Sequence, residues 1–122
     1  MSESYPRSCC PVAGALDVLG DRWTLLVVRD LMRGLTRFGE FRASPECIAS
    51  NILTERLERL VNAGLVDRKP DPEDRRRYRY ALTTAGEALR PVVGALAMWG
   101  LTHLPGTEAK LAPPNPSDSR EA

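Results

Sequence analysis

The segment 50–82 constrains the fold of this chain more than any other part of its sequence. It starts inside a stretch, residues 49–63, whose leucines recur every three or four positions and so predict an amphipathic helix that ends at Gly64. Two short runs of strand-forming residues follow at 65–68 and 78–82, and the polar loop between them holds two prolines and three successive arginines. The segment therefore predicts a helix followed directly by a two-stranded ribbon with a basic tip.

A helix followed by such a ribbon is typical of a winged helix. The helix can enter the major groove of DNA while the ribbon tip reaches the neighbouring backbone or minor groove. Residues 68–79 hold six basic and three acidic side chains, a modest local surplus in a chain whose formal net charge is only +1. An ordinary solvated turn has a similar charge run, but the position of this one at a ribbon tip favours contact with DNA. We therefore expect a DNA-binding regulator rather than an enzyme.

Two helices are predicted ahead of this segment. Residues 11–19 and 22–32 both carry apolar side chains at helical spacing, and Gly20 separates them. The second stretch is apolar on nearly every side, and Asp21 is placed to cap its first turn. A helix that is apolar all round is usually buried, so we expect residues 22–32 to form the middle of the core.

A short helix and a long one complete the predicted pattern. The short helix, 37–43, has Thr36 as its predicted cap and buries its two phenylalanines. The long helix runs from about residue 85 to 104, has Thr84 as its predicted cap and contains Pro91, which can kink it. Together these elements predict an α+β, mostly helical fold: a winged helix-turn-helix with a two-stranded wing and helical dimerisation elements.

The composition fits one small domain, because the chain has 122 residues and 43% of them are hydrophobic. We expect a flexible N-terminus at 1–9, a folded DNA-binding and dimerisation domain at 10–104, and a disordered tail at 105–122, whose polar, proline-rich composition cannot bury a core. No apolar run is long enough to span a membrane, and no signal peptide is recognised. The sequence therefore predicts a cytoplasmic protein whose cysteines are free thiols and which does not associate with membranes.

The sequence lacks the usual marks of an enzyme or a metal site. The candidate zinc ligands are Cys9, Cys10, Cys47 and His103, the only histidine, but two adjacent cysteines do not match the usual ligand spacing. No glycine-rich phosphate loop follows a strand. We therefore expect no catalytic residues, no cofactor and no metal. The alternative to DNA binding is a winged-helix module that binds other proteins without sequence-specific DNA binding.

An ordered set of motifs lies between Cys10 and Gly100. The motifs are Cys10-Pro11, Gly20, Arg22 to Leu25, Arg29 to Leu31, Gly34, Arg37-Phe38, Glu40-Phe41, Ile48, Leu53 to Val66, and Leu82 to Gly100. This set resembles the HxlR-type winged helix-turn-helix regulators, which are related to the larger MarR group. The resemblance implies a dimeric bacterial transcription regulator that binds operator DNA near its target genes.

The residues that contact double-stranded DNA are predicted on the recognition helix and at the ribbon tip. The polar residues in the first turns of helix 49–63 lie away from its leucine face or on its flank, and this end of a recognition helix usually meets base edges. Arg56 matches a basic position of the family pattern, but it lies closer to the buried face and could reach a phosphate only by extending past the helix edge. The predicted DNA-contacting residues are Arg37, as a lesser candidate, with Ser50, Asn51, Thr54, Arg56, Arg75, Arg76 and Arg77.

The chain departs from the family pattern at two places. Ala49 stands where the family often has a serine, and alanine is a poor helix cap, so the start of the recognition helix can be shifted or less stable. The wing looks more like that of the MarR group, in which an acid near the start pairs with an arginine near the tip. The resemblance therefore implies an ion pair of Asp71 with Arg75 or Arg77, which would leave one arginine unavailable to DNA.

The first and last predicted helices are more apolar than one small core requires. We expect part of the last helix to bury against a second subunit, with packing inside the monomer as the alternative. A two-fold homodimer would hold its recognition helices about 34 Å apart and read a palindrome whose half-sites lie one helical turn apart. The predicted interface residues are Leu89, Val92, Val93, Leu96 and Trp99.

In some members of the family that the chain resembles, a cysteine at the position of Cys10 senses oxidants or electrophiles. Cys10 precedes the first predicted helix, whose dipole can lower the pKa of a thiol and favour the reactive thiolate. A disulfide with its counterpart or with another thiol could then shift the two recognition helices. The alternatives are an inert, packed Cys10, a reactive or resolving Cys9, Cys47 as a less favoured partner, and a small-molecule effector.

Overall fold

The structure is a computed structural model that describes residues 8–108. Most of the flexible N-terminus predicted at 1–9 and of the disordered tail predicted at 105–122 lies outside the described residues. Within them, six helices and two strands follow one another along the chain: α1 (Pro11–Leu19), α2 (Thr24–Met32), α3 (Phe38–Arg42), α4 (Ser50–Asn62), β1 (Val66–Pro70), β2 (Tyr78–Leu82), α5 (Thr84–Glu87) and α6 (Arg90–His103).

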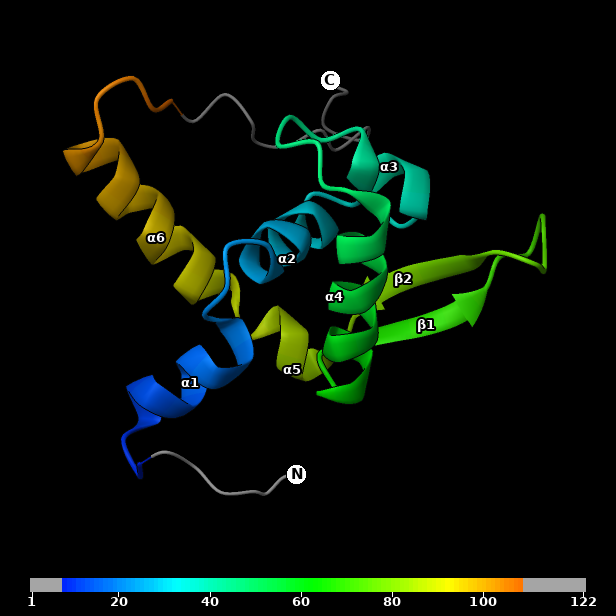
Figure 1. Ribbon diagram of the computed structural model, residues 1–122, viewed down its shortest axis with the longest axis horizontal. Helices are drawn as coiled ribbons and strands as arrows, with labels where there is room; N and C mark the ends of the chain where they lie inside the picture. The colour runs from blue at the N-terminus through cyan, green and yellow to red at the C-terminus, as the bar shows by residue number, and fades with distance from the viewer. Residues whose placement is uncertain (1–7, 109–122) are drawn as a thin grey trace.

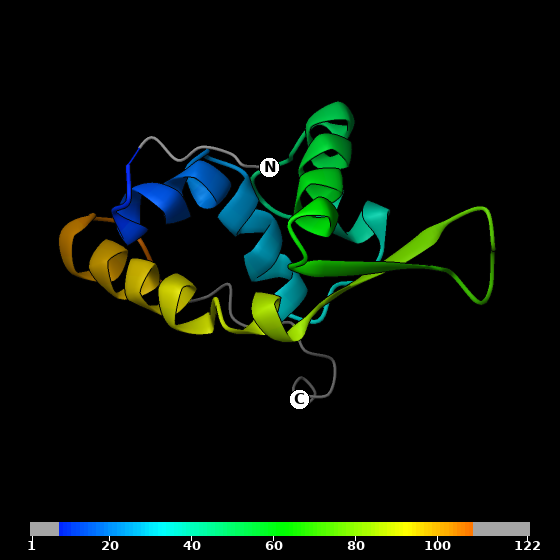
Figure 2. The same ribbon diagram turned by 90° about the horizontal axis from the view of Figure 1, so that it is seen from below.

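Helix α2 lies at the centre of the molecule, with α3 and α4 on one side and α6 on the other (Figure 1). The two strands form an antiparallel ribbon that projects from the side of α4, while α1 and α6 lie at the opposite end (Figure 2). The predicted α+β, mostly helical fold with a two-stranded wing is therefore confirmed.

The hydrophobic core joins the central helix to the recognition helix and the wing. The periodicity of the leucines in α4 turns them all toward the core, because residues three and four apart share one helix face. The core also takes one aromatic ring from α3 and one from β2, which meet edge to face with centroids 6.2 Å apart. Its buried residues are Val27, Val28, Leu31, Phe41, Ile48, Leu53, Leu57, Leu60, Val66 and Tyr80.

The N-cap residue of α2 is Trp23 rather than the predicted Asp21, because the helix begins two residues later than expected, but the side chain of Asp21 still binds the start of the helix. Residues 21–23 form a turn, and the Asp21 carboxylate accepts hydrogen bonds from the backbone N–H groups of Trp23 at 2.8 Å and Thr24 at 3.0 Å. These bonds satisfy two amides that the first turn of a helix leaves without an intrahelical partner.

Helix α3 is not capped by Thr36, so that prediction is wrong. Arg37 is the N-cap residue, and the carboxylate of Glu40 accepts hydrogen bonds from the backbone N–H groups of Thr36 at 2.8 Å and Arg37 at 3.0 Å. The backbone of Thr36 serves a different purpose, since its carbonyl accepts the N–H of Tyr80 at 2.8 Å. An isolated bridge between Arg37 and Arg79 continues this contact and attaches the start of α3 to β2.

The wing follows α4 through Gly64, whose φ of +79° is a left-handed conformation that glycine adopts without strain. The strand β1 reaches Pro70, two residues beyond the predicted end, because Lys69 pairs with Arg79 and Pro70 with Tyr78. A proline is tolerated there, at the end of a strand in a two-stranded ribbon, since its missing N–H interrupts no interior ladder.

The predicted long C-terminal helix is two helices, and Thr83 rather than Thr84 caps the first of them. The side chain of Thr83 accepts the N–H of Gly86 at 3.1 Å and donates its own proton to the carbonyl of Gly64 at 2.7 Å. The break follows at residues 88–89, where the predicted kink is instead a full interruption. In one continuous helix the ring of Pro91 would clash with the carbonyl of Glu87, whereas in the first turn of α6 it is tolerated.

Candidate nucleic-acid interface

The N-terminal half of α4 presents polar side chains to solvent. Ser50, Asn51 and Thr54 are exposed, while the leucines of the opposite face are buried. The hydroxyl of Thr54 donates to the carbonyl of Ser50 at 2.9 Å, which leaves its oxygen as an acceptor for another group. Ala49 is the N-cap residue and provides no side-chain hydrogen bond, as its small side chain predicts.

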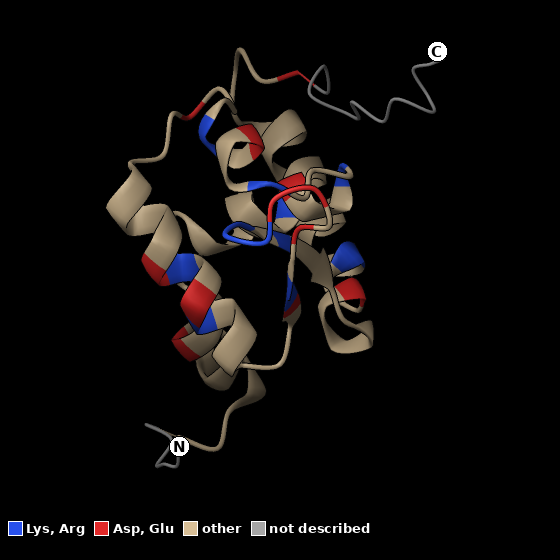
Figure 3. Ribbon diagram, turned by 90° about the vertical axis from the view of Figure 1, so that its right-hand side faces the viewer, with Lys and Arg blue, Asp and Glu red and all other residues tan. Residues whose placement is uncertain are grey.

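The wing tip carries the three successive arginines at the most exposed part of the ribbon. The side chains of Arg76 and Arg77 are 90% and 77% exposed, and Arg75 is exposed as well. Figure 3 shows this basic part of the loop next to its acidic part. The carboxylate of Asp74 accepts hydrogen bonds from the side chain and backbone of Arg76, and these bonds lower the pKa of Asp74.

The wing loop begins with a buried carboxylate, and the ion-pair partners predicted for it are wrong. Asp71 is paired not with Arg75 or Arg77 but with Arg37, whose Nε lies 3.1 Å from its Oδ2, and with Arg79, whose Nε lies 3.8 Å from its Oδ1. The bridge between the backbones of Arg37 and Arg79 brings these two side chains together over the carboxylate. The three tip arginines are therefore not held by Asp71.

Two of the predicted DNA-contacting arginines form ion pairs inside the domain. Besides Asp71, Arg37 has Glu73 as a partner, at 3.3 Å. Arg56 lies on the flank of α4 with its Nε 3.0 Å from the carboxylate of Asp21, and its side chain is only 20% exposed. Sequence reasoning assigned Arg56 to this less exposed flank but missed the acid across from it, which the helical spacing could not indicate.

The wing and the recognition helix also contact each other through Arg68, which sequence reasoning did not single out. Its guanidinium lies over the ring of Tyr78, 4.7 Å from the centroid, and 3.2 Å from the carboxylate of Glu58 on α4. The cation–π contact lies within the wing and orients the guanidinium, while the ion pair with Glu58 connects the wing to α4.

The three cysteines are exposed and free. Cys10 is the N-cap residue of α1, and its carbonyl accepts the N–H of Gly14 at 3.0 Å, so it is not packed into the core of this chain. Cys47 lies in the loop between α3 and α4, and this loop and the start of α1 are well separated in both views (Figures 1 and 2). The thiols of Cys10 and Cys47 therefore lie on different parts of the domain.

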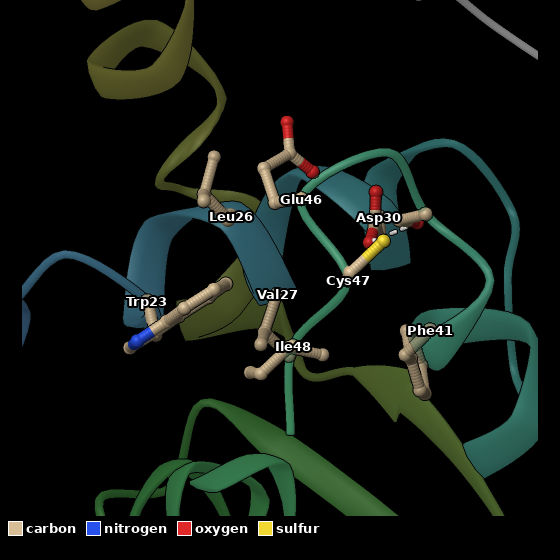
Figure 4. Close-up of a pocket in the computed structure, with 9 residues that line it drawn as sticks. Trp23, Leu26, Val27, Asp30, Phe41, Glu46, Cys47 and Ile48 are labelled. Atoms are coloured by element: carbon tan, nitrogen blue, oxygen red, sulfur yellow. Dashed lines mark hydrogen bonds between the residues drawn. The ribbon is translucent and has the colours of Figure 1, made fainter. Parts of the chain in front are cut away.

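Cys47 borders a small pocket that is also lined by residues of α2 and α3 (Figure 4). Its backbone has a φ of 54°, and its thiol lies 3.5 Å from the carbonyl of Pro45. Beneath the loop, Asp30 is buried and accepts the hydroxyl proton of Ser44 at 2.7 Å, while Arg29 binds Glu46 through both terminal nitrogens, at 2.9 and 2.8 Å. These bonds fix the loop that leads into α4.

Within residues 8–108, no cluster of three or more His, Cys, Asp or Glu side chains could hold a metal ion. No helix in the same part of the chain is long and apolar enough to cross a membrane.

Helices α1 and α6 leave a broad apolar surface uncovered. Neither helix contains a buried residue, and of the predicted interface residues only Leu89 and Val93 pack partly against the core. A groove of about 640 Å³ with mostly apolar walls runs between α2 and α6. Several of the exposed apolar residues were not predicted. The helical spacing of apolar residues shows which of them share a helix face, but it does not show whether that face is buried in the core or exposed. The exposed set is Val12, Leu16 and Val18 on α1, and Val92, Leu96, Met98, Trp99, Leu101 and Leu104 on or just after α6.

Comparison with known proteins agrees with this arrangement of helix, wing and apolar end. The family model of the HxlR-like helix-turn-helix matches residues 18–108, which is most of the chain. The chain belongs to the HxlR-like helix-turn-helix family. The HxlR-type resemblance predicted from the motifs is therefore confirmed.

Individual relatives and solved structures extend the comparison. The chain is 41% identical to Rv3095 of Mycobacterium tuberculosis, named an uncharacterized HTH-type transcriptional regulator, over 97 residues that are 80% of this chain and 61% of that one. It thus spans about three fifths of the length of this relative. The crystal structure of PA1607, described as a putative transcription factor, has a TM-score of 0.75 and 42% identity, and covers 84% of this chain and 72% of PA1607.

A further structural neighbour is named for redox regulation. The reduced form of the redox regulator HypR has a TM-score of 0.67 and 32% identity, over 76% of this chain and 92% of HypR. Its oxidized form has a TM-score of 0.68 and 33% identity, over 76% of this chain and 96% of HypR.

Proposed function

We propose that this HxlR-like chain is a bacterial transcription regulator that binds double-stranded DNA. The observation that supports this most directly is that an exposed, polar N-terminal half of α4 and an exposed basic wing tip occur together, the tip lying at the outer end of the ribbon that projects from the side of α4 (Figure 1). A helix of this kind fits the major groove, and a ribbon beside it reaches the flanking backbone or minor groove. The names of the relatives, which are regulators of the helix-turn-helix type, support the same conclusion and argue against an enzyme.

In this proposal the base-reading residues are Ser50, Asn51 and Thr54. The Asn51 amide can make a bidentate contact with adenine, and the two hydroxyls can donate to or accept from base edges. Arg75, Arg76 and Arg77 contact phosphates or enter the minor groove. Of these three, Arg76 and Arg77 share the carboxylate of Asp74, and an ion pair of such exposed arginines is weak and can give way to a phosphate.

Arg37 and Arg56 can contact DNA only if their side chains turn or extend away from their acidic partners. Arg37 would turn from Asp71 and Glu73, and Arg56 from Asp21. Their guanidinium groups could each contact one phosphate at the edge of the interface.

We further propose a homodimer that reads a palindromic operator. The uncovered apolar residues of α1 and α6, Leu96 and Trp99 among them, support a second copy as the occupant of this surface. Exposed apolar patches larger than a few hundred Å² are uncommon on monomers. Two-fold symmetry would then place two recognition helices one helical turn of DNA apart.

The proposal includes control by thiol oxidation or by an electrophile at Cys10. Its support is the exposure of Cys10 at the first residue before α1, together with the likeness to HypR, a redox regulator solved in two oxidation forms. Such control requires the cysteines to be kept reduced at rest, as in the cytoplasm, where we place the protein.

The experiment that tests the function is selection of duplex DNA from a random library by the purified protein. We expect a palindromic consensus and an affinity for it that falls linearly with the logarithm of salt concentration, because phosphate contacts release counterions. A winged-helix module that binds other proteins would select no consensus. A protein that binds DNA only through its net charge would also select no consensus.

A further inference from the structure

The carboxylate of Asp21 connects the start of α2 to the middle of α4, two elements that are far apart in the sequence. Its Oδ1 accepts the backbone N–H groups of Trp23 and Thr24 and also the Nε–H of Arg56 at 3.0 Å. Its Oδ2 accepts the hydroxyl proton of Thr24 and an N–H of Arg59 at 3.2 Å. One side chain therefore caps the central helix and binds two arginines of the recognition helix.

These bonds keep the carboxylate ionised. Partial burial opposes ionisation, but the hydrogen bonds from Thr24 and Arg56 and from the backbone of Trp23 and Thr24 outweigh it and hold the pKa of Asp21 well below its usual range. In turn, the hydrogen bond to Asp21 raises the pKa of Arg56 against the effect of its own desolvation. The side chains of Asp21 and Arg56 are 23% and 20% exposed, so water screens this pair less than a fully exposed one.

The direction of Arg56 is what separates it from the residues proposed to read DNA. Its guanidinium points from α4 back to the start of α2, whereas Asn51 and Thr54 are exposed on the same helix. A phosphate could bind Arg56 only in competition with Asp21. The ion pair therefore fits a role inside the domain better than a contact with the DNA backbone.

We propose that Asp21, acting through Arg56 and Arg59, is the positioning residue that sets the orientation of the recognition helix in the major groove. This inference rests on the proposed DNA-binding function. Hydrogen bonds to base edges weaken steeply when their length or angle departs from the optimum. A small rotation of α4 about its core contacts would therefore cost affinity for the selected sequence, but not affinity for DNA of any sequence.

The same helix offers a matched control. Glu55 contacts Arg56 and lies 3.8 Å from Arg59, so it gives a negative charge to the same two arginines from within α4. The substitution Glu55→Gln removes that charge without cutting the connection to α2. Asp21→Asn keeps an oxygen that can accept the amide hydrogens of Trp23 and Thr24 while removing the charge.

The experiment measures the affinity of the wild type, Asp21→Asn, Arg56→Gln, the double variant and Glu55→Gln for the duplex selected by the wild type and for a scrambled duplex. We expect each of the two single variants of the pair to bind the selected duplex about tenfold more weakly, with no loss on the scrambled one. The double variant should bind no worse than the weaker single variant, because both changes cut the same connection. Glu55→Gln should change the affinity for the selected duplex by less than about twofold.

A direct phosphate contact by Arg56 would give the opposite pattern. Asp21→Asn would then release the arginine and leave the affinity equal or higher, while Arg56→Gln would lower the salt slope by about 1 on both duplexes. Either result overturns the inference and leaves the proposed function intact, whereas a wild type that selects no duplex overturns both. Thermal melting checks the fold. If Asp21→Asn melts early, Arg56→Gln, which leaves the turn before α2 untouched, decides the question alone.

Discussion

Oδ2 of Asp71 lies 3.1 Å from Nε of Arg37, and this ion pair fastens the start of the wing loop to the start of α3. The carboxylate side chain is only 5% exposed, while Arg37 and Arg79, its partners on either side, are 38% and 44% exposed. The backbone contributes as well, since the N–H of Asp71 donates to the carbonyl of Arg77 at 2.8 Å and closes the wing loop. Asp71 thus joins the loop, the strand β2 and the helix α3.

Asp71→Ala should lower the free energy of unfolding by about 2 kcal/mol, because it leaves two arginines without their buried acid. The value is below that for a fully buried pair, since both arginines are partly exposed to water. Urea unfolding monitored by circular dichroism measures it. Asp74→Ala, which removes an acid from the exposed tip of the same loop, is the control and should cost less than about 0.5 kcal/mol. Equal losses for the two variants would contradict the role assigned to Asp71.

Replacing Arg75, Arg76 and Arg77 together by alanine should weaken binding to the selected duplex and to random DNA alike. Each phosphate contact that is lost should reduce the slope of log affinity against log salt by about 1. Fluorescence anisotropy at several salt concentrations measures both quantities. Arg90→Ala, on α6 and away from the wing, should leave the slope unchanged. An unaltered affinity and slope in the triple variant would show that the wing tip is an ordinary solvated turn.

Asn51→Ala should lose about 1–3 kcal/mol of discrimination at one base pair of each half-site, because the amide can no longer pair with a base edge. The measurement is a competition between the selected duplex and duplexes changed at single positions. Asn62→Ala, at the exposed C-terminal end of the same helix, controls for the loss of a surface amide. If the sequence preference of Asn51→Ala equals that of the wild type, Asn51 is exposed but reads no base.

Leu96→Glu should convert a dimer into a monomer, because it places a charge in the apolar surface of α6. Light scattering at micromolar concentration gives the molar mass, and DNA affinity should fall in parallel, since one recognition helix reads only half of a palindrome. Ala43→Glu, exposed after α3, adds the same charge elsewhere and should remain dimeric. A wild type that is a stable monomer and still binds DNA tightly would rule out the dimer.

Diamide or a quinone should change the DNA affinity of the wild type but not that of Cys10→Ser. Reduction with dithiothreitol should restore binding where a disulfide has formed. Cys9→Ser and Cys47→Ser, which also remove exposed thiols, show whether either of them is the reactive group or the partner. If the oxidant affects Cys10→Ser as strongly as the wild type, Cys10 is not the sensor, and a small-molecule effector becomes the better explanation.

The elements that depend on near neighbours in the chain could be predicted from the sequence. The leucine periodicity of α4, Gly64 at its end, the ribbon that follows and the family motifs all act over a few residues, so they determined the winged-helix fold. The sequence did not show which of two neighbouring residues would cap a helix. Thr83 and Thr84 are both good caps, and the structure uses the first because its hydroxyl can also reach the carbonyl of Gly64 across the wing.

Only the tertiary structure decided which charges meet. Arg56 lies 35 positions from Asp21, and the partners of Asp71 come from α3 and β2 rather than from its own loop. No periodicity or spacing records such pairs, because they arise when α4 and the wing pack against α2 and α3 and bring distant side chains within about 3 Å. The sequence by itself determined that a recognition helix and a basic wing exist. The packing of the core determined which arginines are held inside the domain and which remain exposed.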